Sequence, residues 1–278
     1  MNPSRIIIAV IVLLAVQTGP GCRGDSVPTP PDDNGGGGNP STLSYGDSIF
    51  YIRGSSYTIT PRSMGRTGKF YAWPEGLELK TNTGAIEVNS SETGLRYKVM
   101  FVPDGTRDTF STKIVLSGVN YKDHYHIQSA NDSLSRPFYN ANFSQFTLPS
   151  GCSFDVGGSA RADGLAIDPV TGVINVNQSI RNGFFGHVPA RDGDKKELTV
   201  YYKIPDGSGN VTNKINVKLY FYNDITSVES DITQLLADRT DMFFRMSQNI
   251  FEPAVNTSMA HGLIASRPRP PCVIILGH

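Results

Sequence analysis

Two closely spaced histidines are the residues whose types and spacing suit metal chemistry best. His124 and His126 stand in the stretch DHYH, and residues two apart on an extended strand point to the same side. Imidazole nitrogens are common Zn²⁺ ligands, but such a site needs a third protein ligand. The chain has no His-Glu-x-x-His or Cys-x-x-Cys pattern that would supply one. We therefore predict no metal site and assign DHYH to an interdomain strand or linker, with metal binding as the alternative.

An aromatic loop is the second place where binding chemistry is expected. Residues 183–196 read GFFGHVPARDGDKK and bring together Phe184, Phe185 and His187. Loops that a rigid scaffold positions often carry binding residues, and aromatic rings there can stack on a glycan or anchor a protein. The three residues are a candidate binding loop. The reading we favour is that the phenylalanines fold back onto the core.

A second aromatic group surrounds the single tryptophan. Tyr71 and Trp73 lie in FYAWPEG, where the two rings are a candidate aromatic platform for a sugar. A core position for Trp73 is the reading we favour, because large aromatic side chains are mostly buried.

The N-terminal segment is a targeting signal. Arg5 precedes an apolar run over residues 6–16 that is too short to span a bilayer, as in a cleaved signal peptide. The sequence QTGPGC, ending at Cys22, resembles the lipobox of bacterial lipoproteins, which implies acylation of that cysteine. We expect residues 1–21 to be the signal peptide and residues 22–42, rich in Pro, Gly and Asp, a flexible tether. An ordinary secretory signal is the alternative.

Two cysteines remain for a disulfide. In an oxidising compartment Cys152 and Cys272 are candidates to pair, provided that their Cα atoms come within bonding reach. Two free thiols are the alternative.

The charge balance argues against nucleic acid as a partner. The chain has 25 Lys+Arg against 25 Asp+Glu and no basic cluster, whereas phosphate binding needs clustered positive charge. The many glycines, prolines and aromatic residues are typical of short strands joined by turns.

An internal repeat must position these candidate residues. GLELKTNTGAIEVN at residues 76–89 is echoed by GLAIDPVTGVINVN at residues 164–177. In both copies apolar residues alternate with polar ones around a Thr-Gly turn, which predicts a strand-turn-strand hairpin. Longer alternating strands follow it, at Tyr97–Val102 in the first copy and Leu198–Ile204 in the second. Further matching segments in the same order indicate a duplicated domain.

The hairpin sequence resembles that of Ig-like and cadherin-like domains found in tandem on bacterial surface proteins. The resemblance implies two tandem β-sandwiches and a mainly β fold. Cadherins bind calcium through acidic interdomain motifs, of which this chain has only Asn131-Asp132. We therefore expect no calcium and no other cofactor.

A C-terminal helix is predicted to follow the sandwiches. Seven apolar residues recur at helical spacing after a capping box formed by Thr226 and Glu229: Val228, Ile232, Leu235, Leu236, Met242, Phe243 and Met246. We expect the helix to dock on the second sandwich, with partner binding as the alternative. The predicted domains are 43–122 and 123–225 for the two sandwiches and 226–278 for the helix and an extended C-terminal segment.

These features together predict a non-catalytic cell-envelope lipoprotein for adhesion, scaffolding or recognition. We place it at the outer membrane, on the periplasmic or surface face. Its expected partners are the membrane, through the lipid anchor, and an envelope protein or glycan. One alternative is a surface glycan-binding lipoprotein similar to those of Bacteroidetes polysaccharide-uptake systems. The other is a hydrolase with scattered catalytic groups.

Overall fold

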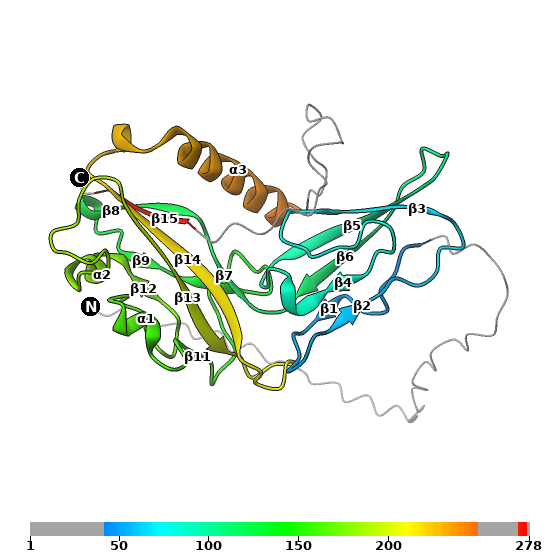
Figure 1. Cartoon of the computed structure of the whole chain (residues 1–278), viewed down its shortest axis with the longest axis horizontal. Helices are drawn as coiled ribbons and strands as arrows, with labels where there is room; N and C mark the ends of the chain where they lie inside the picture. The colour runs from blue at the N-terminus through cyan, green and yellow to red at the C-terminus, as the bar shows by residue number, and fades with distance from the viewer. Residues whose placement is uncertain (1–41, 250–271, 277–278) are drawn as a thin grey trace, which may run out of the picture. The chain divides into compact units, whose positions relative to one another are not determined.

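A computed structural model describes residues 42–249 in full and the backbone of residues 272–276 (Figure 1). These residues belong to one compact unit. The predicted signal peptide, Cys22 and nearly all of the tether lie outside the described residues. Among the helices that are described, none has the length and hydropathy needed to cross a bilayer.

The first repeat consists of two facing sheets. One sheet has the strand order β1-β6-β5-β3 and the other pairs β2 with β4. The elements are β1 (Ile49–Phe50), β2 (Thr58–Ile59), β3 (Gly68–Trp73), β4 (Ile86–Glu87), the 3₁₀ turn η1 (Val88–Ser90), β5 (Arg96–Pro103) and β6 (Phe110–Leu116). Apolar side chains from both sheets, such as Phe70 and Ile86, fill the core between them.

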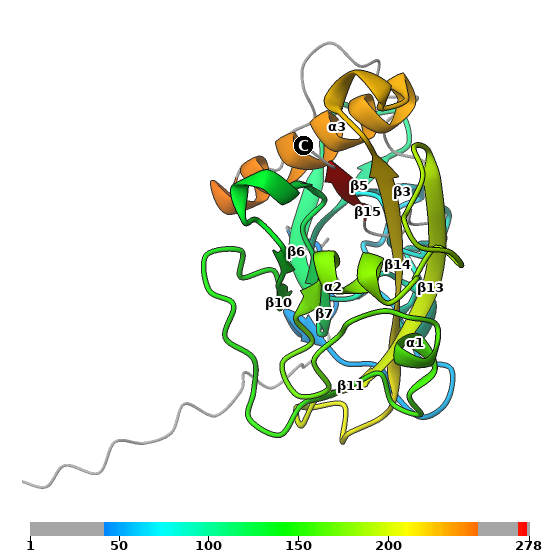
Figure 2. The same cartoon turned by 90° about the vertical axis from the view of Figure 1, so that its left-hand side faces the viewer.

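The second repeat contains the long antiparallel pair β13–β14, which lies side by side in both views of the ribbon (Figure 2). Its first elements are β7 (Val119–Tyr121), β8 (His124–Ile127), η2 (Gln128–Ala130), β9 (Leu134–Ser135), β10 (Pro137–Tyr139), β11 (Ser153–Phe154) and α1 (Ser159–Ala162). The later ones are β12 (Ile174–Asn175), α2 (Val176–Arg181), β13 (Asp194–Lys203), β14 (Asn213–Tyr222), η3 (Ile225–Ser227), α3 (Ser230–Ser247) and β15 (Cys272–Leu276). A second apolar core lies within this repeat.

The duplicated hairpin is confirmed in both repeats. Isolated bridges join Leu79 to Ile86 and Ile167 to Ile174, the predicted apolar pairs. The turn glycine has a positive φ in each copy, +71° at Gly84. A Cβ on this glycine would lie 2.6 Å from a phenylalanine ring of the facing strand. Only glycine satisfies both conditions, so the repeated Thr-Gly is a folding requirement.

The two repeats differ in how β1 and β8, strands from their N-terminal parts, join the main sheet. In the first repeat β1 pairs directly with β6 in parallel. In the second repeat β15 lies between β8 and β14 and pairs in parallel with both. The segment Cys272–Leu276 therefore completes the second sheet, and among the described strands β8 joins that sheet only through β15.

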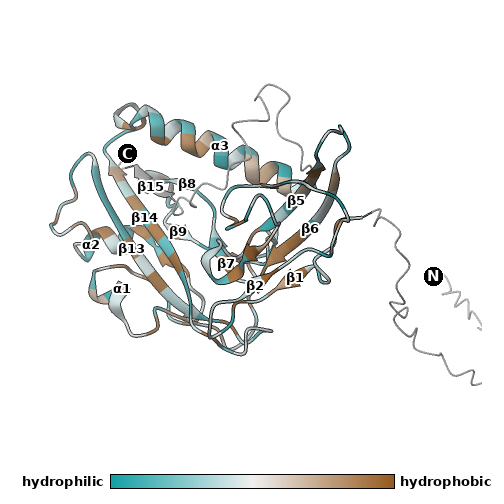
Figure 3. Ribbon diagram, turned by 45° about the vertical axis from the view of Figure 1, so that its right-hand side comes forward, coloured by the Kyte–Doolittle hydropathy of each residue, from teal (hydrophilic) through white to brown (hydrophobic). Residues whose placement is uncertain are grey.

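Helix α3 packs against both repeats, which corrects the expected docking on the second sandwich alone. Ile232 and Leu236 pack with tyrosines of β14, whereas Met242, Phe243 and Met246 belong to the first core. Hydrophobic and hydrophilic residues alternate along the helix in Figure 3, in agreement with the predicted stripe.

The predicted start of the helix is wrong. Glu229 is the N-cap of α3 and makes no side-chain cap hydrogen bond, and η3 occupies Ile225–Ser227, where the capping box is expected. Asp224 caps that short turn instead, accepting a hydrogen bond of 2.7 Å from the Thr226 amide. Asp224 therefore starts the separate turn η3, and α3 begins only at Ser230.

The fold class is mainly β with multiple sheets and few helices, as predicted. The first repeat is a sandwich whose two sheets enclose an apolar core. In the second repeat, the five-stranded sheet and the two-stranded pairs β7–β10 and β9–β12 contribute to a second apolar core. The predicted long strands are confirmed within a few residues at β5 and β13. The boundaries 43–122 and 123–225 stay predictions, since Phe138 and Phe143, which follow residue 122, pack in the first core.

Candidate functional site

The two histidines of the DHYH stretch lie on one strand and face a pocket. They occupy alternate positions of β8, so both point to the same side, while Tyr125 between them packs against the tyrosines of β14 and the start of α3. His124 is exposed, whereas His126 is only 2% exposed. The sheet therefore fixes one imidazole and leaves the other at the surface.

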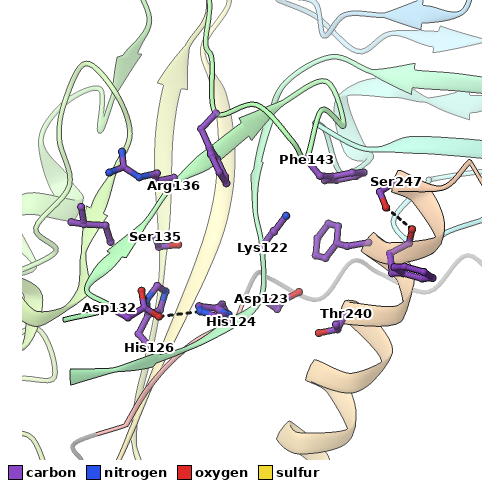
Figure 4. A pocket seen from close by; sticks show the side chains of 14 residues that line it. Lys122, Asp123, His124, His126, Asp132, Ser135, Arg136, Phe143, Thr240 and Ser247 are labelled. Carbon is purple, nitrogen blue, oxygen red and sulfur yellow. Dashed lines mark hydrogen bonds and ion pairs between the residues drawn. The ribbon is translucent and has the colours of Figure 1, made fainter. Parts of the chain in front are cut away.

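A turn after β8 supplies a third polar group. The turn η2 ends at Asn131, whose left-handed φ of 58° reverses the chain; asparagine tolerates this conformation well. Asp132 then faces the two histidines: its Oδ2 lies 3.0 Å from His124 Nε2, and its Oδ1 lies 3.2 Å from His126 Nδ1. Figure 4 shows the three side chains together at one end of the pocket.

Burial sets the protonation of the inner histidine. Removal from water lowers the pKa of His126, and the Asp132 carboxylate only partly offsets this effect. His126 is therefore neutral at physiological pH and has a lone pair to offer. Its Nε2 is shielded from solvent and makes no hydrogen bond within the described residues.

An aromatic wall from other elements lies across the pocket from the carboxylate. Phe243 and Phe244 come from α3, and Phe143 and Phe146 from the segment after β10. Phe143 and Phe243 stack edge to face with centroids 5.2 Å apart. Phe244 is 60% exposed and Phe146 48%, so two apolar rings are open to solvent at a site that also holds charged groups.

The pocket has a volume of about 650 Å³ and combines these two walls. In Figure 4, Thr240 and Ser247 of α3 stand opposite His126 and Asp132. Lys122 and Arg136 add positive charge to the lining. A concave site with an apolar wall and a few convergent polar groups is typical of ligand binding.

Sequence reasoning found the histidines but missed their partner. The absence of a third ligand argued against a metal site, yet Asp132 is only a short turn away from β8. The available signal was the Asn-Asp pair after the strand, because asparagine favours the left-handed turn that directs the next residue back. The aromatic wall carried no such signal, since it joins elements far apart in sequence.

The candidate loop at residues 183–196 is corrected in part. Phe184 is completely buried in the second core, and Phe185 is half-buried against the same core. His187 Nε2 lies 2.8 Å from Asp194 Oδ2 at the start of β13. The phenylalanines fold back, as in the reading we favoured, because burial of apolar rings stabilises the insertion.

The candidate aromatic platform is likewise not an exposed one. Tyr71 and Trp73 are half-buried at the end of β3, and Trp73 packs against the first core. The core position that we favoured for Trp73 describes it better than a sugar platform.

The candidate disulfide is wrong. Cys152 is a buried free thiol whose Sγ donates to the Pro149 carbonyl oxygen over 3.0 Å. Cys152 precedes Ser153, which pairs with Lys203 of β13. Cys272 pairs with Lys218 of β14, and Lys218 pairs in turn with Glu197 of β13. At the rise of a strand, Glu197 and Lys203 are roughly 20 Å apart along β13. The two cysteines, which lie beside these positions, are therefore far beyond the roughly 7 Å limit between Cα atoms for a disulfide.

Comparison with known proteins adds little to this geometry. No protein-family model matches the chain, and no curated protein matches its sequence. Among solved structures, human protocadherin-24 EC1-2 is 4% identical with a TM-score of 0.23, over 64% of this chain and 95% of that one.

Two further solved structures show equally distant likeness. Drosophila OTK extracellular domains 3-5 are 8% identical with a TM-score of 0.20, over 66% of this chain and 65% of that one. A tri-modular GH5 endo-β-1,4-glucanase from Bacillus licheniformis, complexed with cellotetraose, is 12% identical with a TM-score of 0.20, over 64% of this chain and 38% of that one. These TM-scores are too low to assign a family, so the fold class rests on the strands and sheets described above.

Proposed function

We propose that this protein is a non-catalytic recognition protein of the cell envelope, anchored through Cys22, that binds its ligand in the pocket between β8 and α3. The observation that carries the proposal is the pocket itself, where solvent-exposed Phe146 and Phe244 lie beside a charged wall. Its volume of about 650 Å³ suits a small ligand or a protruding group of a larger partner.

The chemistry around the histidines favours binding over catalysis. His124 and His126 both contact Asp132. Neither hydrogen-bonds a serine, threonine or cysteine that it would activate as a nucleophile, within the part of the chain that the structure describes. Two rigid sandwiches bridged by α3 hold the walls of the pocket in place, as a recognition site requires.

Glycan binding is the second candidate function, and the two exposed phenylalanines favour it. Aromatic faces stack on the apolar faces of sugar rings, while carboxylates and cationic side chains such as Arg136 bind hydroxyl groups. The pocket presents both kinds of group in one concavity, unlike the residues 183–196 that sequence analysis singled out.

The test is a glycan array together with a pull-down from envelope extracts, using the full chain and its Phe244→Ala variant. Loss of an exposed ring that contacts the ligand should lower affinity roughly tenfold or more without unfolding the protein. Tyr201→Ala is the matched control, because Tyr201 is an exposed ring outside the pocket. Binding that is absent throughout, or equal in wild type and Phe244→Ala, would contradict the proposal.

Anchoring is tested separately. Cys22→Ala removes the proposed acylation site, so the variant should appear in the soluble fraction of lysed cells instead of the membrane fraction. Unchanged membrane association would show that another segment holds the protein there.

A further inference from the structure

We propose that His124, His126 and Asp132 form a binding site for a divalent transition-metal ion of the Zn²⁺ type. Each residue offers one ligand atom, and all three atoms lie within 4.8 Å of one another. The three residues line the same pocket as the proposed recognition site. The function that we give to the ion therefore rests on the proposed recognition role. The proposed metal site reverses our expectation from the sequence that no metal binds.

The distances between the ligand atoms are close to those of a coordination sphere. Zn–N and Zn–O bonds of about 2.0–2.1 Å separate the ligand atoms of a tetrahedral site by about 3.3 Å. The contacts from Asp132 to His124 and His126 measure 3.0 and 3.2 Å. Small side-chain rotations are enough to close the sphere, and the His124 side chain, 58% exposed, is free to make them.

The burial of His126 holds one ligand in place before an ion binds. The residue is 2% exposed, and its Nδ1 lies 3.2 Å from Asp132 Oδ1. Nδ1 is therefore the ring nitrogen that faces the carboxylate, and an ion between the two residues would coordinate it in place of this hydrogen bond. A ligand that is already held in place costs less free energy to order on binding.

The ligand types select the class of metal. Two imidazoles and one carboxylate suit Zn²⁺ and neighbouring transition metals, whereas calcium requires six or more oxygen ligands. Three protein ligands leave one coordination position for water or an oxygen of a bound molecule. Such an ion would stand beside the aromatic wall and present a positive centre to an anionic or hydroxylated ligand.

The test is titration of the metal-free full chain with Zn²⁺ against a fluorescent chelator. We expect one saturable site per chain, with affinity reduced at least tenfold in His124→Ala and in Asp132→Asn. Asp132→Asn retains hydrogen-bonding capacity but lacks the carboxylate ligand, so it separates metal binding from a purely structural His–Asp contact. Both substitutions are at positions open to solvent, and circular dichroism should show an intact fold.

Two controls make the result specific. His187→Ala removes a histidine that pairs with Asp194 outside the pocket, and it should leave the affinity unchanged. Ca²⁺ in excess should not displace Zn²⁺. Co²⁺ should give intense visible absorption bands of a low-coordinate site in wild type and weaker bands in Asp132→Asn.

Absence of a saturable site, or equal affinity in wild type, His124→Ala and Asp132→Asn, would overturn the metal site. The titration contains no recognition ligand, so its failure leaves the proposed function standing. Conversely, a glycan array and pull-down that capture nothing would refute the recognition role while a bound zinc ion remained.

Discussion

At the scale of single residues, Glu92 makes the stability of the fold depend on pH. Burial raises the pKa of its carboxyl from the usual 4.5 to about 7, against the opposing effects of Arg239 and a hydrogen bond from Asn120; nearby Asp123 raises it further. Its Oε2 is shielded and unsatisfied within the described part of the chain. The folded state therefore holds a proton that the unfolded state releases between these two pKa values.

The sign follows from proton linkage. Below about pH 4.5 both states are protonated, and between there and about pH 7 the folded state binds more protons, so stability falls as the pH rises. Glu92→Gln imitates the protonated form and should remove this loss, making the variant on the order of 2 kcal/mol more stable than wild type at pH 8. Urea unfolding at pH 4.5 and pH 8 measures the difference. Parallel pH profiles for the two proteins would contradict it.

At the scale of secondary-structure elements, β15 decides whether the histidine strand belongs to its sheet. In the part of the chain that the structure describes, β8 pairs in that sheet with β15 alone, through the positions Val273–Leu276 opposite His124–Ile127. Main-chain pairing from the C-terminus is therefore what holds both candidate metal ligands in register.

Removal of residues 272–278 should release β8. We expect hydrogen exchange at His124–Ile127 to accelerate at least tenfold, because each lost pairing opens main-chain amides to water. Addition of a peptide with the sequence CVIILGH should restore protection. Fluorescence of Trp73, which belongs to the first repeat, reports whether that sandwich stays folded. Unchanged exchange at β8 in the truncated protein would show that other contacts hold the strand.

At the scale of the whole molecule, buried polar contacts join the two sandwiches. The Tyr202 hydroxyl, from β13 of the second repeat, lies 2.9 Å from Thr93 Oγ1 in the first and accepts a hydrogen bond from the Val119 amide over 3.3 Å. Burial raises the pKa of Tyr202 to about 12, so the hydroxyl stays protonated. Ser117 also donates to Asp206 across the junction, over 2.8 Å.

Tyr202→Phe should weaken this junction. The substitution leaves the buried Val119 amide without its acceptor and should lower the free energy of unfolding by about 1–3 kcal/mol. Tyr201→Phe, one position along β13 and 43% exposed, is the matched control and should change stability by less than about 0.5 kcal/mol. Urea unfolding compares them, and equal midpoints for the two variants would show that the junction does not depend on this hydroxyl.

The sequence by itself determined the local architecture. Period-two alternation specifies the long strands β5 and β13, and the Thr-Gly turns specify both hairpins, because a strand buried on one face and a turn with positive φ at Gly84 or Gly172 leave a local pattern. The helical stripe of α3 was readable for the same reason, although its first turn was not. The histidine pair on β8 was also visible, as two residues on one face of a strand.

Only the tertiary structure decided which of these residues act together. Asp132 joins the histidines through a turn, α3 brings Phe243 and Phe244 across from them, and β15 separates β8 from β14. The same long-range packing buries Phe184 and holds Cys152 far from Cys272. Periodicity records whether a side chain is buried, but not which distant segment buries it, because that choice depends on how the whole chain packs around its two cores.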